Sequence, residues 1–282
     1  MESQVQAHYH VPNLIAPVSA ALEARGKSLF SLTPKDLAPV DQLHTGGLRA
    51  TVTLAEKLAL PAGTRILDAG CGLGGTGRVF ARHSGCWVTG IDLSPSFVEA
   101  AAIFSQWCGL ESAMDFHAGS VTALPFDDQS FDAVLCQHIL MNVPDKEQAL
   151  AEFFRVLKPG GRLILSELYQ GENPKVQYPV PWADRAEISV LESWEDQARR
   201  LEETGFIPVF EEEMTAKGIA FWEHINAMAA KAKAAPAGTK TPVLGPHLVF
   251  GKNARHFRKT MAGNFASGAL QWVDAEFKTP AA

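Results

Sequence analysis

The chain has 282 residues, of which 46% are apolar, enough to bury one large core or one core with a small cap. Its formal net charge is −6 and no group of lysines or arginines follows a helix face, which argues against nucleic acid as the substrate and favours small molecules. No apolar run approaches ~20 residues and no basic stretch precedes an apolar core at the N-terminus, so we expect neither a membrane span nor a signal peptide, and a cytoplasmic location.

The first element with a clear pattern lies close to the N-terminus. Residues 48–58 have the spacing of an amphipathic helix that leads toward the first strand. His44 precedes Thr45, Gly46 and Gly47, and a glycine pair between two helices suits the hinge of a lid. A plain surface loop is the alternative interpretation of this segment.

Apolar, partly β-branched runs bounded by glycine recur along the middle of the chain, with helical patterns between them. This alternation predicts a doubly wound parallel sheet. We expect residues 159–161 to end one helix and to turn the chain into the fifth strand. The expected strands cover residues 65–70, 86–92, 114–119, 131–139, 162–169 and 206–213, and a further helix is expected over 194–204.

A glycine-rich loop follows the first predicted strand. Residues 65–77 place a carboxylate, Asp68, and five glycines after an apolar run, where backbone must come close to a ligand. The glycines fit G-x-G-x-x-G in two registers, so they do not distinguish a nicotinamide or flavin site from an S-adenosylmethionine site. Asp68 favours S-adenosylmethionine, because a carboxylate repels a pyrophosphate and attracts an ammonium and a sulfonium. A buried carboxylate that serves only the loop amides is the alternative.

Three further stretches follow the glycine loop in order: residues 90–95, 124–132 and 155–163. With the loop they make four signatures, and the chain resembles class I S-adenosylmethionine-dependent methyltransferases over residues 40–215. Segments 36–44, 137–142 and 178–182 look like the small-molecule branch of that family. This branch includes the quinone-pathway C-methyltransferases and the sarcosine and dimethylglycine N-methyltransferases.

The resemblance implies an α/β fold. We expect a Rossmann-like, seven-stranded, mostly parallel sheet, whose last strand, predicted at 270–277, enters antiparallel between the fifth and the sixth. Helices from the N-terminal part and from a C-terminal insertion would cap the active site. The expected parts are an N-terminal helical lid (1–47), the S-adenosylmethionine-binding core (48–216), a helical cap insertion (217–269) and the final antiparallel strand (270–282).

The resemblance also places the cofactor. Asp92 would accept hydrogen bonds from both ribose hydroxyls, or alternatively serve only as a turn residue that caps a helix. Leu93 would pack on the adenine or belong to the core. The family often has Gly-Asp-Ala after the third strand, whereas Gly119, Ser120 and Val121 stand here, so a neutral Ser120 implies a weaker adenine contact. The other expected cofactor-binding residues are Asp68, Gly70, Gly72, Gly74, Val121 and Gln137.

His138 is the predicted catalytic residue, because it follows the fourth strand and ligands of open α/β sheets bind outside the carboxyl ends of strands. It would deprotonate the acceptor, its unperturbed pKa of roughly 6.5 suiting neutral pH, or only orient the substrate. The family likeness makes His44 a substrate contact from the lid. Tyr178, Trp182 and Trp222 would build an aromatic wall around a cationic or apolar acceptor, with core packing as the alternative.

These features predict an enzyme that transfers a methyl group from S-adenosylmethionine, by in-line displacement, to nitrogen, oxygen or carbon of a small-molecule acceptor, releasing S-adenosylhomocysteine. A dinucleotide-dependent oxidoreductase and a non-catalytic S-adenosylmethionine binder are the alternatives. The four cysteines lack C-x-x-C spacing, so neither a metal site nor a disulfide is expected. The sequence leaves a homodimer open.

Overall fold

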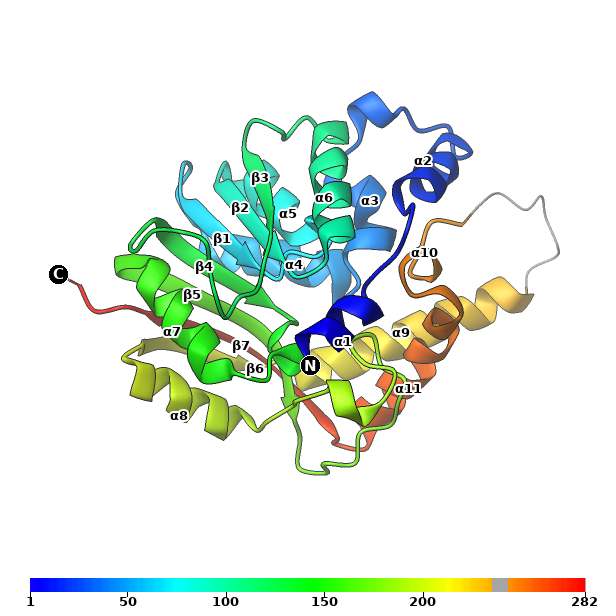
Figure 1. Cartoon of the computed structure of the whole chain (residues 1–282). Helices are drawn as coiled ribbons and strands as arrows, with labels where there is room; N and C mark the ends of the chain where they lie inside the picture. Colours follow the sequence, from blue (N-terminus) through cyan, green and yellow to red (C-terminus); the bar gives the residue numbers. More distant parts are fainter. Residues whose placement is uncertain (235–242, 282) are drawn as a thin grey trace.

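The structure, a computed structural model, describes residues 1–234 and 243–281, and the strands within them form one seven-stranded sheet (Figure 1). The strand order is β3-β2-β1-β4-β5-β7-β6, with β7 antiparallel to both β5 and β6 and the other neighbours parallel. The predicted fold class and the place of the antiparallel strand are confirmed. The strands are β1 (Arg65–Ala69), β2 (Trp87–Asp92), β3 (Met114–Ala118), β4 (Phe131–Gln137), β5 (Leu157–Gln170), β6 (Ile207–Glu213) and β7 (Leu270–Lys278).

Helices precede the sheet and join its strands. None of the described helices combines the length and the apolar character that a membrane span requires. The α-helices are α1 (Glu2–His8), α2 (Ile15–Glu23), α3 (Pro34–Asp41), α4 (Gly47–Leu58), α5 (Gly75–Ser84), α6 (Pro95–Trp107), α7 (Lys146–Val156), α8 (Trp194–Thr204), α9 (Thr215–Ala234), α10 (His247–Phe250) and α11 (Ala254–Ala266). Short 3-10 helices are η1 (Leu29–Ser31), η2 (Leu140–Asn142), η3 (Ala186–Ile188) and η4 (Gly251–Asn253).

The sheet separates two apolar cores. Successive residues of a strand point to opposite faces, so Ile66 of β1 joins one core and Leu67 joins the other. The first core packs against α4, α5 and α6, and the second against α7 and α8. Ile66 and Leu67 are almost fully buried, and burying one such side chain contributes about 1.5–3 kcal/mol. The two cores fix the ends of the strands, where the loops of the site begin.

Strand β5 begins earlier than the sequence predicts. The predicted end of a helix at 159–161 is wrong, because the strand already starts at Leu157. Residues 159–161 lie inside the strand, where its pairing with β4 is interrupted. The reason is a partner far along the chain. Gly161 donates its backbone N–H to the Thr279 hydroxyl at 3.0 Å and accepts the Thr279 N–H at 2.9 Å. These contacts therefore attach the segment to the residues that follow β7.

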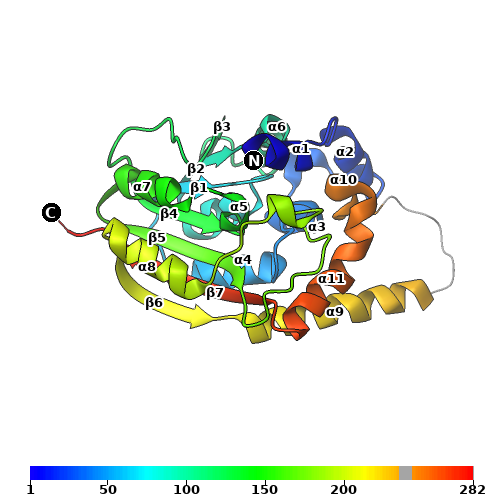
Figure 2. The ribbon, with the colours of Figure 1, turned by 60° about the horizontal axis from the view of Figure 1, so that its bottom comes forward.

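The residues between β6 and β7 build helices at one end of the sheet. α9, α10 and α11 lie together at the end of the molecule opposite the C-terminus (Figure 1, Figure 2). A third apolar cluster joins α9 and α11 to the sheet, through Trp222 of α9, Met261 of α11 and Leu168 of β5. Part of the predicted insertion, residues 235–242, lies outside the described residues. The cluster brings side chains far apart in sequence to the edge of the sheet where the loops after β4 and β5 emerge.

Candidate active site

A cavity of about 210 Å³ lies over the carboxyl ends of the parallel strands. Its lining comes from the ends of β1 to β5 and the loops after them, around the point between β1 and β4 where the strand order reverses. Gly74 and Tyr178 are not among the lining residues. The other predicted site residues all line this cavity, namely His44, Asp68, Gly70, Gly72, Asp92, Leu93, Ser120, Val121, Gln137, His138, Trp182 and Trp222.

The glycine loop is held by backbone hydrogen bonds to the neighbouring strand. Gly70 and Cys71 both donate their N–H to the Ile91 carbonyl, at 2.8 and 2.9 Å. At Gly70, φ is +71° and a Cβ would collide with Ile139, so the position accepts only glycine. At Gly72, φ is +53° but a Cβ would meet no atom within 4 Å, because the position faces the cavity. Backbone at Gly72 is therefore open to a ligand.

Gly74 is a glycine for another reason. It is the N-cap of α5 and has a φ of +75°, and a Cβ there would lie 2.9 Å from the Arg78 guanidinium and 3.1 Å from the Phe116 ring. Close packing beneath the loop, rather than the cavity, demands the small residue at this position.

Asp92 links the loops that follow β1 and β2. One carboxylate oxygen accepts the Gly72 N–H at 2.8 Å and the other accepts the Ser94 N–H at 2.8 Å. Burial raises the pKa of Asp92, while these two amides act against that shift. Each oxygen keeps a further acceptor position, so Asp92 can hold the loop and bind hydroxyls at the same time.

A second group of polar side chains lies between β1, β4 and α5. Asp68 accepts the Gly77 N–H at 3.1 Å, and burial raises the pKa of Asp68 to about 7. Gln137 accepts the Thr76 hydroxyl at 2.6 Å, while its amide nitrogen is buried without a hydrogen-bond partner among the described residues. This part of the cavity thus offers a carboxyl group and an amide donor to a ligand.

Asp41 belongs to the same group and was missed by sequence reasoning. It lies at the end of α3 and pairs with the buried Arg78 at 2.7 Å. Its other carboxylate oxygen is buried with no hydrogen-bond partner in the described structure, and the residue lines the cavity. The sequence resemblance includes segment 36–44, but no local pattern distinguishes Asp41 within it.

The far end of the cavity, over β3, contains a carboxylate from the N-terminal helix. The Ser120 hydroxyl donates to the carboxylate of Glu2 at 2.5 Å, and the Thr122 hydroxyl lies 3.4 Å from the same oxygen. Glu2 and Ser120 both line the cavity. A carboxylate therefore lies beside the position where Ser120 replaces an acid, and nothing in the local sequence pointed to Glu2.

Residues of α1 and the turn after it form hydrogen bonds with the loop after β2 and with the segment after β4. Gln6 donates to the Leu93 carbonyl at 3.1 Å, and the Tyr9 hydroxyl donates to Asn142 at 3.1 Å. Asn142 in turn donates to the Trp182 carbonyl at 3.0 Å. Tyr9 and Asn142 also line the cavity and were not predicted as site residues. Their hydrogen bonds tie α1 to the loop after β5.

His138 lies just beyond β4 in a left-handed conformation, with a φ of +56°. Its backbone N–H donates to the Ser166 carbonyl at 3.0 Å. The ring centre is 5.4 Å from that of His44 and 6.1 Å from that of Trp272, and neither ring nitrogen has a hydrogen-bond partner among the described residues. Burial, and then the neighbouring His44, hold the pKa of His138 well below its usual range. The expected titration near neutral pH is therefore wrong, and the ring is neutral at pH 7.

Glu167 of β5 holds the turn that carries His138. This fully buried carboxyl group accepts the Ile139 N–H at 2.9 Å and the Leu140 N–H at 3.4 Å. Burial raises the pKa of Glu167 to about 7. The turn is thus fixed from the neighbouring strand, which sets the position of the histidine ring.

His44 is fixed on both ring nitrogens. Nδ1 lies 3.0 Å from the Thr45 carbonyl and Nε2 lies 3.1 Å from the Thr51 hydroxyl. Burial lowers the pKa of His44 to about 4. At the glycine pair that follows, a Cβ on Gly46 would lie 2.8 Å from Trp272. Close packing accounts for this glycine, so the structure gives no support to the predicted hinge.

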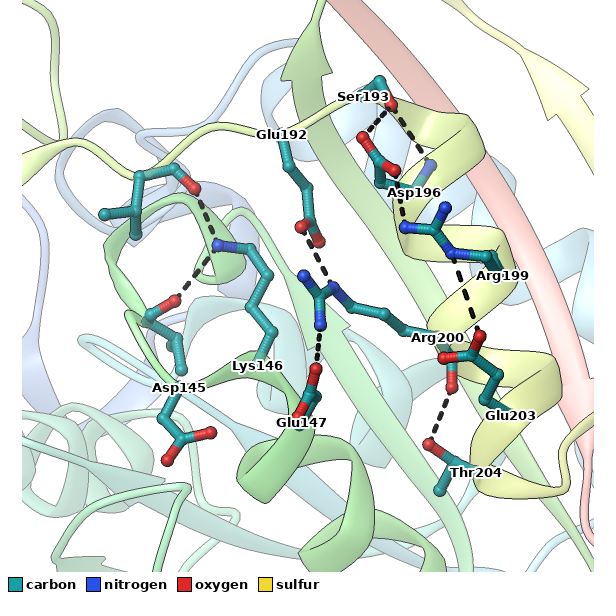
Figure 3. A network of polar contacts seen from close by, with 12 residues as sticks. Asp145, Lys146, Glu147, Glu192, Ser193, Asp196, Arg199, Arg200, Glu203 and Thr204 are labelled. Carbon is teal, nitrogen blue, oxygen red and sulfur yellow. Dashed lines mark hydrogen bonds and ion pairs between the residues drawn. The ribbon is translucent and has the colours of Figure 1, made fainter.

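The loop after β5 is held in place by a polar network on α7 and α8 (Figure 3). Lys146, at the start of α7, donates to the Val190 carbonyl at 2.6 Å. Arg200 of α8 lies between Glu192 and Glu147 and pairs with both. These contacts fix the segment that carries Trp182 over the cavity.

Comparison with known proteins finds a family match within the core of the chain. Residues 67–165 match the methyltransferase domain family. The methyltransferase GfsG of Streptomyces halstedii is 35% identical over 133 residues, which are 47% of this chain and 48% of that protein. The chain spans less than half of the length of the curated relatives it matches.

Solved structures extend the likeness of the fold to the whole chain. The cyclase SpnF has a TM-score of 0.69 at 22% identity, covering 100% of this chain and 98% of its own. A geranyl diphosphate C-methyltransferase from Streptomyces coelicolor, solved with Mg2+, a thiolodiphosphate analogue and S-adenosylhomocysteine, has a TM-score of 0.65 at 19% identity, covering 98% and 97%. The resemblance seen in the sequence is confirmed for residues 67–165, which match the methyltransferase domain family.

Proposed function

We propose that the protein is an S-adenosylmethionine-dependent methyltransferase that acts on a small molecule. The observation that carries this proposal is the single cavity that joins the glycine loop, Asp92 and His138 above a methyltransferase core. When bound, S-adenosylmethionine supplies an electrophilic methyl group on a sulfonium. The chain's own residues have to hold that cofactor, exclude water and align the acceptor.

The adenosine part of the cofactor would lie over β2 and β3. Asp92 would accept the ribose hydroxyls with the acceptor positions that Gly72 and Ser94 leave free. Leu93 and Val121 would flank the adenine, and Ser120 would contact its polar edge. The nearby carboxylate of Glu2 supports this placement because an exocyclic amino group needs an acceptor.

The methionine part would lie between β1 and β4. Its ammonium would bind Asp68 and the free oxygen of Asp41, and the amide nitrogen of Gln137 would donate to its carboxylate. The open backbone at Gly72 would pass beneath it. The unpaired buried atoms support this fit, since a ligand with both charges would satisfy them.

The acceptor would bind beside His138, which would accept its proton or orient it. His44, Trp182 and Trp222 line the same region. Tyr178 packs against the same apolar cluster without lining the cavity and would support this wall from behind. Alignment of the acceptor atom ~3 to 3.5 Å from the methyl group supplies much of the rate enhancement in such a displacement. Residues 1–47 and 217–269 would form the lid and the cap over the core at 48–216, with the strand at 270–282 completing the sheet.

The second candidate is a protein that binds the cofactor without transferring a methyl group. The likeness to a cyclase over the whole chain favours keeping this alternative. The match to a methyltransferase domain leaves a dinucleotide-dependent oxidoreductase without support.

Binding and turnover separate these functions. In a thermal-shift series, S-adenosylhomocysteine should raise the midpoint of unfolding and NAD should not, because a ligand of the native state stabilises it. Incubation with methyl-deuterated S-adenosylmethionine and metabolite pools should then yield a labelled small molecule. Stabilisation by NAD alone contradicts the proposal, and binding without any labelled product favours the second candidate.

A further inference from the structure

The strand order divides the cavity into two parts of different chemistry. The part over β1, β2 and β3, which we call the cofactor half, has four lining carboxyl groups, Glu2, Asp41, Asp68 and Asp92. The part over β4, β5 and the helices between β6 and β7 we call the acceptor half. We assign to it His138 and five buried apolar residues, Met141, Leu168, Trp182, Trp222 and Met261.

The other assigned residues are apolar, and the polar residues that line the cavity near them, His44, Thr45 and Asn142, already make side-chain hydrogen bonds within the protein. Each of the five apolar residues is at most 8% exposed, and all belong to the third apolar cluster. The two tryptophans have already used their indole N–H groups. Trp182 donates to the Ser189 hydroxyl at 2.9 Å and Trp222 donates to the Thr45 hydroxyl at 3.2 Å. A ligand in this half would therefore meet hydrocarbon, thioether and aromatic surface.

The acceptor half has no charged group to pair with a charged acceptor. Among the described residues that line the whole cavity, none is a lysine or an arginine. A phosphate or a carboxylate would be buried there without a counter-ion, which is strongly unfavourable. The lining carboxyl groups lie in the cofactor half, and that of Asp41 is already paired with Arg78. An ammonium would thus find aromatic rings but no acidic partner.

His138 provides the polar group of the acceptor half. Its ring is enclosed by His44 and Trp272, yet neither nitrogen has a partner within the described residues. A buried polar atom without a hydrogen bond is unfavourable, so a ligand that supplies the missing partner gains affinity. A neutral imidazole can accept a hydrogen bond from a hydroxyl on one nitrogen and then take its proton.

We propose that the acceptor is an uncharged, largely apolar molecule that presents a hydroxyl group to His138, so that the reaction is an O-methylation. This inference rests on the proposed function and names its substrate class. The hydroxyl oxygen forms the new bond to the methyl carbon, and the electron pair of the breaking carbon–sulfur bond stays on sulfur. The hydroxyl proton passes to His138 and from there to water, which leaves a neutral ether and a neutral thioether.

A series of ligands on one ring system tests this class: a naphthol, the matching naphthoate, the naphthyl phosphate and the naphthylmethyl ammonium. Calorimetry on protein saturated with S-adenosylhomocysteine gives their affinities, and methyl-deuterated S-adenosylmethionine with mass spectrometry shows which are methylated. We expect the naphthol to bind at least about tenfold more tightly than each charged member. The labelled product should be its methyl ether.

A cation introduced at the cavity should change the order of the ligand affinities. Phe250 of α10 lines the cavity and is partly exposed. Phe250→Lys should raise the affinity for the naphthoate relative to the naphthol by about tenfold, because the acid then has a partner, whereas Phe250→Leu should not. Unchanged affinity for S-adenosylhomocysteine shows that both variants are folded.

The outcomes separate the substrate class from the proposed function. Tighter binding of a charged member, methylation on nitrogen, or failure of every member to bind to protein that binds S-adenosylhomocysteine overturns the inference and leaves the proposed function standing. Absence of S-adenosylhomocysteine binding overturns the proposed function itself.

Discussion

The carboxylate of Asp92 accepts the backbone N–H of Gly72 at 2.8 Å, so the acid at the end of β2 fixes the loop that follows β1. A hydrogen bond between a carboxylate and a backbone amide is charge-assisted and stronger than one between neutral groups. The two features that the sequence identified separately, a glycine loop and an acid after the second strand, are therefore one structural unit. Changes in either should affect cofactor binding.

Gly72→Ala should weaken the binding of S-adenosylhomocysteine by at least about tenfold. A Cβ at this position would meet no protein atom but would enter the cavity. Gly109→Ala is a matched control, because Gly109 has a similar φ of +63° with equally open space and lies outside the cavity lining. Both variants should lose similar stability from backbone strain. Equal affinities in calorimetry would place the cofactor elsewhere.

Asp41→Ala should lower the free energy of unfolding by about 3–5 kcal/mol, because the buried Arg78 would lose its carboxylate partner and keep only neutral hydrogen-bond acceptors. Denaturant titration measures this loss. Glu187→Ala, which removes the exposed partner of Arg185, is the control and should change stability little. A loss at Asp41 no larger than the control's would show that two carbonyl groups and the Ser105 hydroxyl are enough to satisfy the Arg78 charge.

The strands and helices of the core could be predicted from the sequence because their patterns are local. The short apolar run of β1 and the amphipathic spacing of α4 lie within single segments. Contacts between distant segments could not be predicted. Asp41 and Glu2 reach the cavity through packing of the N-terminal helices, and the early start of β5 depends on Thr279.

The ionisation state of the site was also beyond sequence reasoning. In the sequence His138 is a histidine like any other. Its low pKa, and so its neutral state, follow from burial beside His44, which only the folded chain creates. The same holds for Glu167, which is an unremarkable strand residue in the sequence and the support of the His138 turn in the structure. Burial, rather than residue type, sets these pKa values.

Glu167 should make the protein less stable as pH rises toward neutrality. The pKa of this carboxyl group is about 7 in the folded chain against 4.5 as its ordinary value, so the native state binds the proton more tightly than the unfolded state. The stabilisation is complete below the unfolded value and is lost as pH rises through 7, by up to about 3 kcal/mol.

The comparison of the parent with Glu167→Gln isolates this contribution. His44 contributes with the opposite sign, because burial lowers its pKa to about 4 and its contribution to stability therefore rises with pH. Since His44 is present in both proteins, its effect cancels in the difference. Denaturant titrations at several pH values between 4 and 8 should show a steeper fall for the parent. Parallel curves would mean that Glu167 is ionised in the folded protein throughout.

Replacement of His138 should lower the rate of methyl transfer without affecting the cofactor. The ring accepts the acceptor's proton in the mechanism proposed above, so His138→Gln should reduce the single-turnover rate by about 100-fold while S-adenosylhomocysteine affinity stays within about twofold. Because burial holds the pKa of His138 well below its usual range, the parent rate should stay flat from pH 8 to pH 6.5 and fall only in more acid solution. The His138→Gln variant should lack this fall in rate at acid pH.

The control for this experiment is His44→Gln. Both ring nitrogens of His44 are already bonded within the protein, so the rate of this variant should still fall in acid solution. An effect of His138→Gln confined to the Michaelis constant of the acceptor would make the residue an orienting group, and equal rates at every pH would remove it from the chemistry.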